Sequence, residues 1–181
     1  MTLVELYNKG GYETYPTDKG TVHSYLPVYD ELFRPFQDKE INLFEVGYYK
    51  GGSVNLWKDY FSKARIKSID LVPETFHGSK FNFKSARIIF EQKDVRTITT
   101  DYFNDFKPDI IIDDGSHDLV TVINFIRVAY PALNDGGILI AEDFNVEKNR
   151  KKITNLGIPF TVIDRRGIFG REDDALIIIR K

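Results

Sequence analysis

The sequence predicts an α/β protein with a doubly wound, mostly parallel sheet of seven strands that ends in an antiparallel hairpin. From residue 41 onward, short runs rich in β-branched residues alternate with longer stretches that have the period of a helix. This alternation indicates a parallel sheet with helices on both faces. Near the C-terminus, two strand-like runs are joined by a loop too short for a crossover helix, so they should pair antiparallel.

The predicted strands follow from the apolar runs. Five runs have the composition of buried parallel strands, and two later runs form the hairpin. The parallel strands are expected at residues 41–46, 66–71, 86–90, 108–112 and 138–141, and the hairpin at residues 160–164 and 175–180.

Three helices are predicted outside these strands. Apolar residues recur at steps of three and four over residues 119–133, which marks one face of an amphipathic helix, and the glycine pair 136–137 should end it. A second helix should follow Ser53, whose side chain is placed to cap it. A short helix is predicted within residues 17–39.

Length and composition are those of an ordinary folded protein. The 181 residues fit one domain, so we expect residues 1–181 to form a single domain with residues 1–40 as a cap or lid. A formal net charge of -2 gives no overall attraction for nucleic acid. No apolar run is long enough to cross a bilayer and no signal-peptide pattern is seen, so we expect a cytoplasmic protein without a membrane partner. The absence of cysteine excludes disulfides and thiolate metal sites.

A glycine-rich turn, EVGYYKGGS at residues 45–53, follows the first predicted strand. Its glycines allow close approach of a ligand and positive φ angles, and the start of the next helix favours an anion. The spacing G-x-x-x-G-G differs from the dinucleotide fingerprint, which argues against a pyrophosphate ligand. Glu45 would repel phosphates but attract the ammonium and sulfonium groups of a methionine-type ligand. A tight turn without a ligand is the alternative.

Two further carboxylates could hold the rest of such a ligand. Asp70 lies at the end of the second strand, where an acidic side chain can accept hydrogen bonds from both ribose hydroxyls. NAD and S-adenosylmethionine share that ribose. Asp94 follows the third strand and could bind the adenine amino group, although a solvated loop carboxylate is an alternative reading of this residue.

Acidic residues also follow the last two parallel strands. The fourth strand runs into DDGSH at residues 113–117, and the fifth into Glu142 and Asp143. Parallel strands end at the same edge of a sheet, so these four carboxylates should lie close together, in the crevice where such sheets bind ligands. Their crowding requires neutralisation by lysines and amides or by a cation, and hard oxygen ligands favour Mg²⁺ over calcium or manganese. Alternatively, Asp114 and Ser116 could cap the following helix.

His117 is the expected general base of this cluster. A histidine side chain is largely neutral at physiological pH and can take a proton from a hydroxyl. A metal ion beside it would acidify that hydroxyl. A purely structural histidine is the alternative.

These motifs together resemble the macrocin and mycinamicin sugar O-methyltransferase family, and the resemblance implies a Rossmann-like class I methyltransferase fold. It also includes the upstream segment, in which Thr17, Asp18 and Lys19 are followed by His23, Tyr25 and Tyr29. The resemblance covers about residues 17–144, and DDGSH is its most specific part.

The resemblance implies a magnesium-dependent transfer of a methyl group from S-adenosylmethionine to a sugar hydroxyl. By position, Asp114, Glu142 and Asp143 would hold the metal, and His117 and Asp114 would be the catalytic residues. The acceptor is expected to be a glycan or a glycosylated small molecule, and a homo-oligomer is compatible with the sequence. The residues expected to contact the cofactor are Glu45, Gly47, Tyr48, Gly51, Ser53, Asp70, Asp94 and Asp113.

Two other functions remain open from the sequence. An NAD-dependent oxidoreductase would use the same sheet and Asp70, but the glycine spacing and Glu45 argue against it. A non-catalytic carbohydrate-binding module on the same fold is the third reading, although Glu45, Asp70 and His117 are all present.

Overall fold

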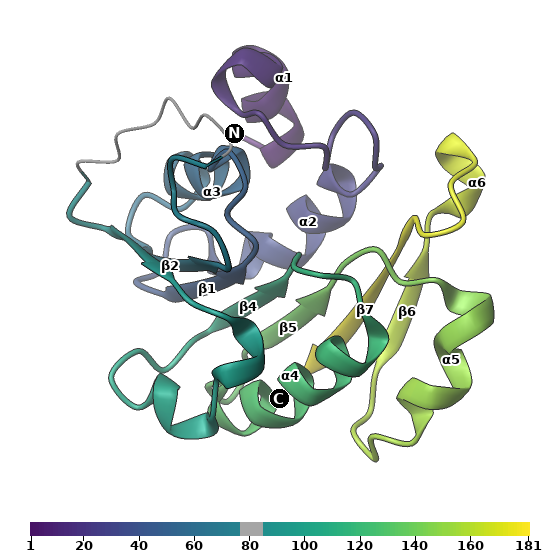
Figure 1. Cartoon of the computed structure of the whole chain (residues 1–181). Coiled ribbons are helices and arrows are strands. Elements are labelled where there is room, and N and C mark those ends of the chain that lie inside the picture. The colour runs from purple at the N-terminus through teal and green to yellow at the C-terminus, as the bar shows by residue number, and fades with distance from the viewer. Residues whose placement is uncertain (77–84) are drawn as a thin grey trace.

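The computed structural model describes residues 1–76 and 85–181. Seven strands form one sheet, whose neighbours follow the order β3-β2-β1-β4-β5-β7-β6 (Figure 1). The strands are β1 Asn42–Val46, β2 Arg65–Asp70, β3 Ile88–Gln92, β4 Ile110–Asp113, β5 Ile138–Ala141, β6 Thr161–Asp164 and β7 Ala175–Arg180.

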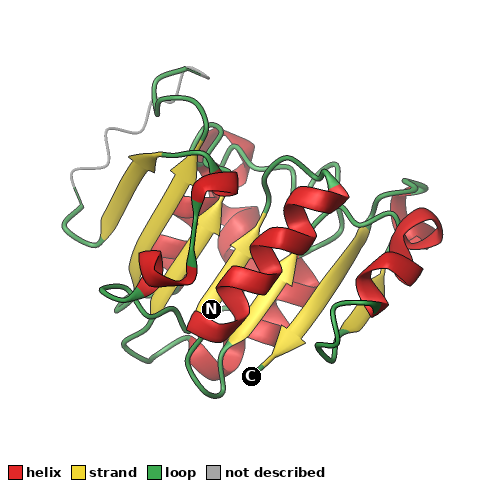
Figure 2. Ribbon diagram, turned by 60° about the horizontal axis from the view of Figure 1, so that its bottom comes forward, coloured by secondary structure: helices red, strands yellow, loops and turns green. Residues whose placement is uncertain are grey.

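Helices cover both faces of this sheet (Figure 2). Three 3₁₀ helices add to the six α-helices, and none of these helices in the described ranges has both the length and the apolar character needed to cross a lipid bilayer. The helices are α1 Leu3–Thr14, α2 Leu26–Phe33, η1 Arg34–Phe36, α3 Gly52–Tyr60, η2 Val95–Thr97, η3 Thr100–Phe103, α4 Leu119–Ala132, α5 Val146–Thr154 and α6 Arg166–Phe169.

The pairing confirms the predicted fold class. β1 pairs parallel with both β2 and β4, and the parallel ladder continues to β3 on one side and β5 on the other. β7 lies antiparallel between β5 and β6. The C-terminal hairpin therefore closes the sheet beyond β5, and the first five strands all end at the same edge.

Three details of the sequence prediction were wrong. The third strand begins at Ile88 rather than at residue 86, and it is half-exposed rather than buried because it forms the edge of the sheet. α4 ends at Ala132, before the glycine pair 136–137 that was expected to stop it. Ser53 does not cap α3, because the N-cap position is taken by Gly51.

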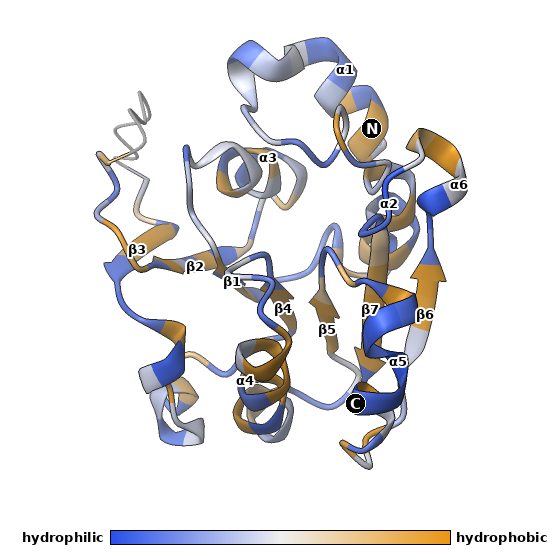
Figure 3. Cartoon of the chain, turned by 45° about the vertical axis from the view of Figure 1, so that its right-hand side comes forward, coloured by the Kyte–Doolittle hydropathy of each residue, from blue (hydrophilic) through white to orange (hydrophobic). Residues whose placement is uncertain are grey.

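The core consists of two apolar clusters, one on each face of the sheet. One joins α1, α2 and α3 to the sheet, and the other joins α4 and the two 3₁₀ helices after β3 to it. Figure 3 shows the central strands β4, β5 and β7 as mostly hydrophobic, whereas α5 is largely hydrophilic. Trp57, which is fully buried, packs against Tyr29 and Phe33 of α2 and so ties α3 to the N-terminal segment.

Candidate active site

The glycine-rich turn joins β1 to α3 and passes directly beside the loop after β4. Gly47 has φ +94°, and a Cβ atom at this position would lie only 2.0 Å from the carbonyl oxygen of Asp114. Gly51 also has a positive φ, of +75°, at the N-cap of α3. Any other residue at Gly47 would therefore push the two loops apart, and their contact fixes the floor of the site.

A cavity of about 790 Å³ opens above this turn, at the carboxyl edge of the sheet. Its volume is within the range of pockets that enclose a small-molecule ligand. The wall comes from the N-terminal segment, the turn after β1, the ends of β2 and β3 and the loop after β4. It includes residues 16–18, 46–49, 52–53, 70–71, 93–96 and 114–118.

Five of the eight predicted cofactor contacts line this cavity: Gly47, Tyr48, Ser53, Asp70 and Asp94. The other three predicted contacts, Glu45, Gly51 and Asp113, lie outside its wall in the described structure.

Glu45 lies beneath the turn and is fully buried. Its Oε2 accepts a hydrogen bond of 3.1 Å from the Ser53 hydroxyl, whereas its Oε1 has no hydrogen-bond partner among the described residues. Burial raises the pKa of Glu45 to about 7, against the opposing charge of Lys19. Glu45 thus supports the start of α3 from below, and Ser53 is used for this contact rather than as a helix cap.

Asp70 and Asp94 hold the wall of the cavity at the ends of β2 and β3. Oδ2 of Asp70 accepts hydrogen bonds from the backbone N–H groups of Tyr48 and Tyr49, both at 2.9 Å. Asp94 binds the guanidinium of Arg96 with both carboxylate oxygens, and these contacts hold its pKa below the ordinary value. Asp70 therefore fixes the glycine-rich turn while its carboxylate still faces the cavity.

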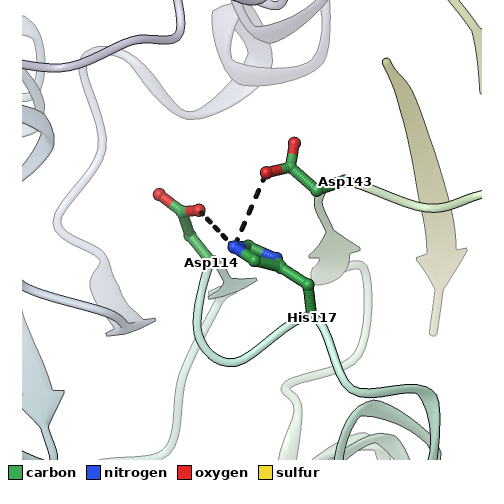
Figure 4. A group of neighbouring side chains, drawn as sticks. All are labelled: Asp114, His117 and Asp143. Atoms are coloured by element: carbon green, nitrogen blue, oxygen red, sulfur yellow. Dashed lines mark ion pairs between the residues drawn. The ribbon is translucent and has the colours of Figure 1, made fainter. Parts of the chain in front are cut away.

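Asp114, His117 and Asp143 form a compact cluster after β4 and β5 (Figure 4). One donor atom from each lies within 4.8 Å of the others. Nε2 of His117 is 3.5 Å from Asp143 Oδ2 and 4.0 Å from Asp114 Oδ1. Asp114 and His117 also line the cavity, so the cluster and the cofactor-sized space share two residues.

The backbone of this cluster is strained at two positions. His117 has φ +52° and Asp143 has φ +55°, both in the left-handed region that side chains other than glycine seldom adopt. Such conformations persist only where the surrounding structure enforces them, and they concentrate at functional sites. Burial raises the pKa of Asp143, and the nearby His23 and His117 oppose that rise.

Glu142 is not a member of this cluster. Its Oε1 accepts a 2.5 Å hydrogen bond from the Tyr29 hydroxyl, and both of its oxygens lie within 3.0 Å of Lys19 Nζ. The same Nζ is 2.5 Å from Asp114 Oδ2. Lys19 is fully buried, and although burial disfavours its charge, Asp114 and Glu142 raise its pKa well above the ordinary value.

The predicted gathering of four carboxylates is thus divided between two environments. Glu142 is neutralised by a lysine, one of the two options that the sequence left open. Asp113 is buried behind the cluster with Oδ2 lacking a hydrogen-bond partner in the described residues, and burial raises its pKa to about 7. The three-residue cluster contains two of the three predicted metal ligands, Asp114 and Asp143, together with the predicted base.

Two of the residues that organise the site come from the N-terminal segment. Nothing in the spacing of Lys19 or Tyr29 predicts contact with the ends of β4 and β5. The only signal for these two residues in the sequence was that they belong to the upstream segment of the family resemblance.

Comparisons with known proteins agree with the fold. No protein-family model matches the chain. A tetracenomycin rhamnosyl 2'-O-methyltransferase from Streptomyces olivaceus is 30% identical over 135 residues, which cover 70% of this chain and 35% of that protein. Demethylmacrocin O-methyltransferase from Streptomyces fradiae is 26% identical over 162 residues, covering 80% and 40%. Mycinamicin VI 2''-O-methyltransferase from Micromonospora griseorubida is 28% identical over 131 residues, covering 68% and 32%.

This chain is a relative of the macrocin and mycinamicin sugar O-methyltransferases. It spans 32–40% of the length of these curated relatives. Among solved structures, the mycinamycin methyltransferase MycE in complex with Mg, SAH and mycinamycin VI matches all of this chain and 54% of its own, with a TM-score of 0.75 at 20% identity. Fibrillarin from Aeropyrum pernix, in complex with S-adenosyl-L-methionine, matches 78% of the chain with a TM-score of 0.59 at 16% identity. This relative of the sugar O-methyltransferases therefore has the Rossmann-like methyltransferase fold that its sequence predicts.

Proposed function

We propose that this chain carries the catalytic site of an S-adenosylmethionine-dependent, Mg²⁺-dependent O-methyltransferase whose acceptor is a hydroxyl of a sugar or of a glycosylated small molecule. The observation that carries the proposal is that Asp114 and His117 line the cavity and also belong, together with Asp143, to the cluster. A cofactor held along the glycine-rich turn would then lie next to the predicted base. Curated relatives that act as O-methyltransferases support the reaction class.

The cofactor would lie along the wall formed by Gly47, Ser53 and Asp70. Gly47 keeps the turn against the Asp114 loop, and the start of α3 favours the carboxylate of the cofactor. Asp70 would accept hydrogen bonds from the ribose hydroxyls. Asp94, already paired with Arg96, would lie near the adenine.

The donor set of the cluster fits a divalent cation. Asp114 and Asp143 offer carboxylate oxygens, which hard cations prefer, and one oxygen of each lies within 4.8 Å of the other and of a His117 ring nitrogen. Glu142 would complete the predicted ligand set only by exchanging its contact with Lys19. When bound, the cation would polarise the acceptor hydroxyl and lower its pKa.

The protein side chains would perform the remaining steps. Nε2 of His117 would accept the hydroxyl proton while the oxygen attacks the methyl carbon, so that the new O–C bond forms as the C–S bond of the sulfonium breaks. Holding donor and acceptor in line would supply much of the rate. The products are the methyl ether, S-adenosylhomocysteine and a proton on His117, which then passes to solvent.

The two alternatives have less support. NAD would share the ribose contact with Asp70, but the curated relatives named above are methyltransferases, and the turn lacks the dinucleotide spacing. A non-catalytic module would not need strained backbone at both His117 and Asp143.

The test is a methyl-transfer assay with radiolabelled S-adenosylmethionine and a panel of rhamnosides and other glycosides. We expect label in a methyl ether, formed with Mg²⁺ and lost with a chelator or in Asp143→Asn. Label on a nitrogen or carbon atom would contradict the O-methyltransferase assignment. Transfer that is unaffected by the chelator would contradict the metal requirement.

A further inference from the structure

Buried polar side chains of the N-terminal segment end on the carboxylates that follow β4 and β5. Lys19 and Tyr29 bind Glu142, as described above, and the Tyr25 hydroxyl donates a 2.8 Å hydrogen bond to Asp143 Oδ1. These contacts account for Glu142 and for one oxygen of Asp143. Asp143, which has a left-handed backbone, has a further contact that holds it in the cluster.

His23 supplies a second contact to the same oxygen. Its Nε2 lies 3.5 Å from Asp143 Oδ1, and the side chain is only 3% exposed. Oδ2, the other oxygen of Asp143, faces His117. His23 and Tyr25 therefore engage one oxygen of Asp143 and leave the second one for the cluster.

The other face of His23 is fixed by the C-terminal hairpin. Its Nδ1 lies 3.3 Å from Oδ1 of Asp174, a fully buried residue that directly precedes β7. Oδ2 of Asp174 accepts a hydrogen bond from the Ser24 hydroxyl, and the His23 ring stacks on Tyr25 at 4.8 Å between centroids. The imidazole thus has Asp174 at Nδ1, Asp143 and the more distant Asp18 carboxylate (4.0 Å) at Nε2, and one aromatic ring stacked on it.

We propose that His23, held by Asp174, is a positioning residue for the metal ligand Asp143. Outer partners that hydrogen-bond a ligating carboxylate fix its orientation, and their loss typically lowers metal affinity by about 10- to 100-fold. The arrangement links the N-terminal segment, the end of β5 and the start of β7 at one carboxylate. The inference rests on the proposed function, because Asp143 is a metal ligand only within it.

The test compares Mn²⁺ affinity of the full chain, measured by calorimetry, in wild type, His23→Ala and His23→Gln. We expect His23→Ala to weaken Mn²⁺ binding by about 10- to 100-fold, and His23→Gln to weaken it less because the amide still reaches one carboxylate. Affinity for S-adenosylhomocysteine in the presence of a chelator should stay unchanged in both. Tyr7→Phe is the matched control, since it removes a buried hydroxyl contact of the same segment, to the Thr17 carbonyl, that ends on no carboxylate.

Asp174→Asn provides a second variant that does not touch Asp143. It should also weaken Mn²⁺ binding, and it should add little further loss once His23 is already alanine. Equal Mn²⁺ affinity in wild type and in the folded His23 variants would overturn the positioning role while leaving the metal site intact. If His23→Ala does not fold, the Mn²⁺ affinities of His23→Gln and Asp174→Asn decide whether His23 positions Asp143. Absence of Mn²⁺ binding in the wild type would instead contradict the metal part of the proposed function.

Discussion

Among single residues, the carboxylates of the site lie in two different arrangements. Lys19 is buried between Glu142 and Asp114, whereas Asp114 and Asp143 face His117 in an open cluster. The closeness of these carboxylates could be predicted, because parallel strands end at one edge of the sheet. The lysine could not, since its contact with Glu142 spans 123 positions of sequence and no local pattern encodes it.

His117 is predicted to act as a base and not as a metal ligand. His117→Ala should leave the affinities for S-adenosylhomocysteine and Mg²⁺ unchanged and lower the rate of methyl transfer by about 10²- to 10⁴-fold. Calorimetry and the methyl-transfer assay measure the two effects separately. A loss of Mg²⁺ affinity would assign His117 to the metal instead, and full activity would exclude the base role.

Glu45 should make stability depend on pH in a defined direction. Its pKa rises from 4.5 to about 7 on folding because of burial, so the folded chain keeps a proton that the unfolded chain loses. The free energy of unfolding should therefore fall as pH rises through that interval, by up to about 1.4 kcal/mol per pH unit from this residue. Urea unfolding with a chelator should show a shallower fall in Glu45→Gln. An identical pH dependence in the two proteins would contradict the assigned pKa.

At the scale of the elements, strand positions followed the apolar runs to within about two residues. β5 and β7 have the predicted bounds, because both are buried and apolar except for the exposed Arg180 at the end of β7. β3 is partly exposed because it lies at the edge of the sheet. Its place there depends on the order of the strands, which the apolar run of β3 alone does not show. α1 was missed although a signal is present: the Thr2 hydroxyl accepts from Glu5 N–H while the Glu5 carboxylate accepts from Thr2 N–H.

The contact between the two loops at Gly47 gives a prediction at this scale. Gly47→Ala should destabilise the fold by about 1–3 kcal/mol, because alanine is strained at φ +94° and its Cβ would overlap the Asp114 carbonyl. Urea unfolding measures the loss. Gly167→Ala in α6 is the control, since it has no neighbour within 4 Å and should be nearly neutral. Equal stability of the two variants would contradict the close approach.

At the scale of the whole molecule, the N-terminal segment supplies buried partners both to the core and to the site. Our expectation that residues 1–181 form one domain with residues 1–40 as its cap stays a prediction, as do a cytoplasmic location and self-association. Trp57, the single tryptophan, reports on whether the N-terminal segment and the sheet form one domain, because it packs directly against α2.

Unfolding in urea should therefore be a single transition. Trp57 fluorescence and far-ultraviolet circular dichroism should have the same midpoint, because loss of the N-terminal packing and loss of the sheet would be one event. A fluorescence transition at lower urea than the loss of secondary structure would show that the segment unfolds on its own. That result would contradict the single-domain expectation.

The cavity at the carboxyl edge of the sheet should bind the methyl donor beside a divalent cation. Calorimetric titration of S-adenosylhomocysteine into the full chain, with Mg²⁺ present, tests it most directly and needs no knowledge of the acceptor. We expect saturable binding of one ligand per chain, with weaker binding in Asp70→Asn. A folded chain that gives no binding heat at millimolar ligand would contradict it.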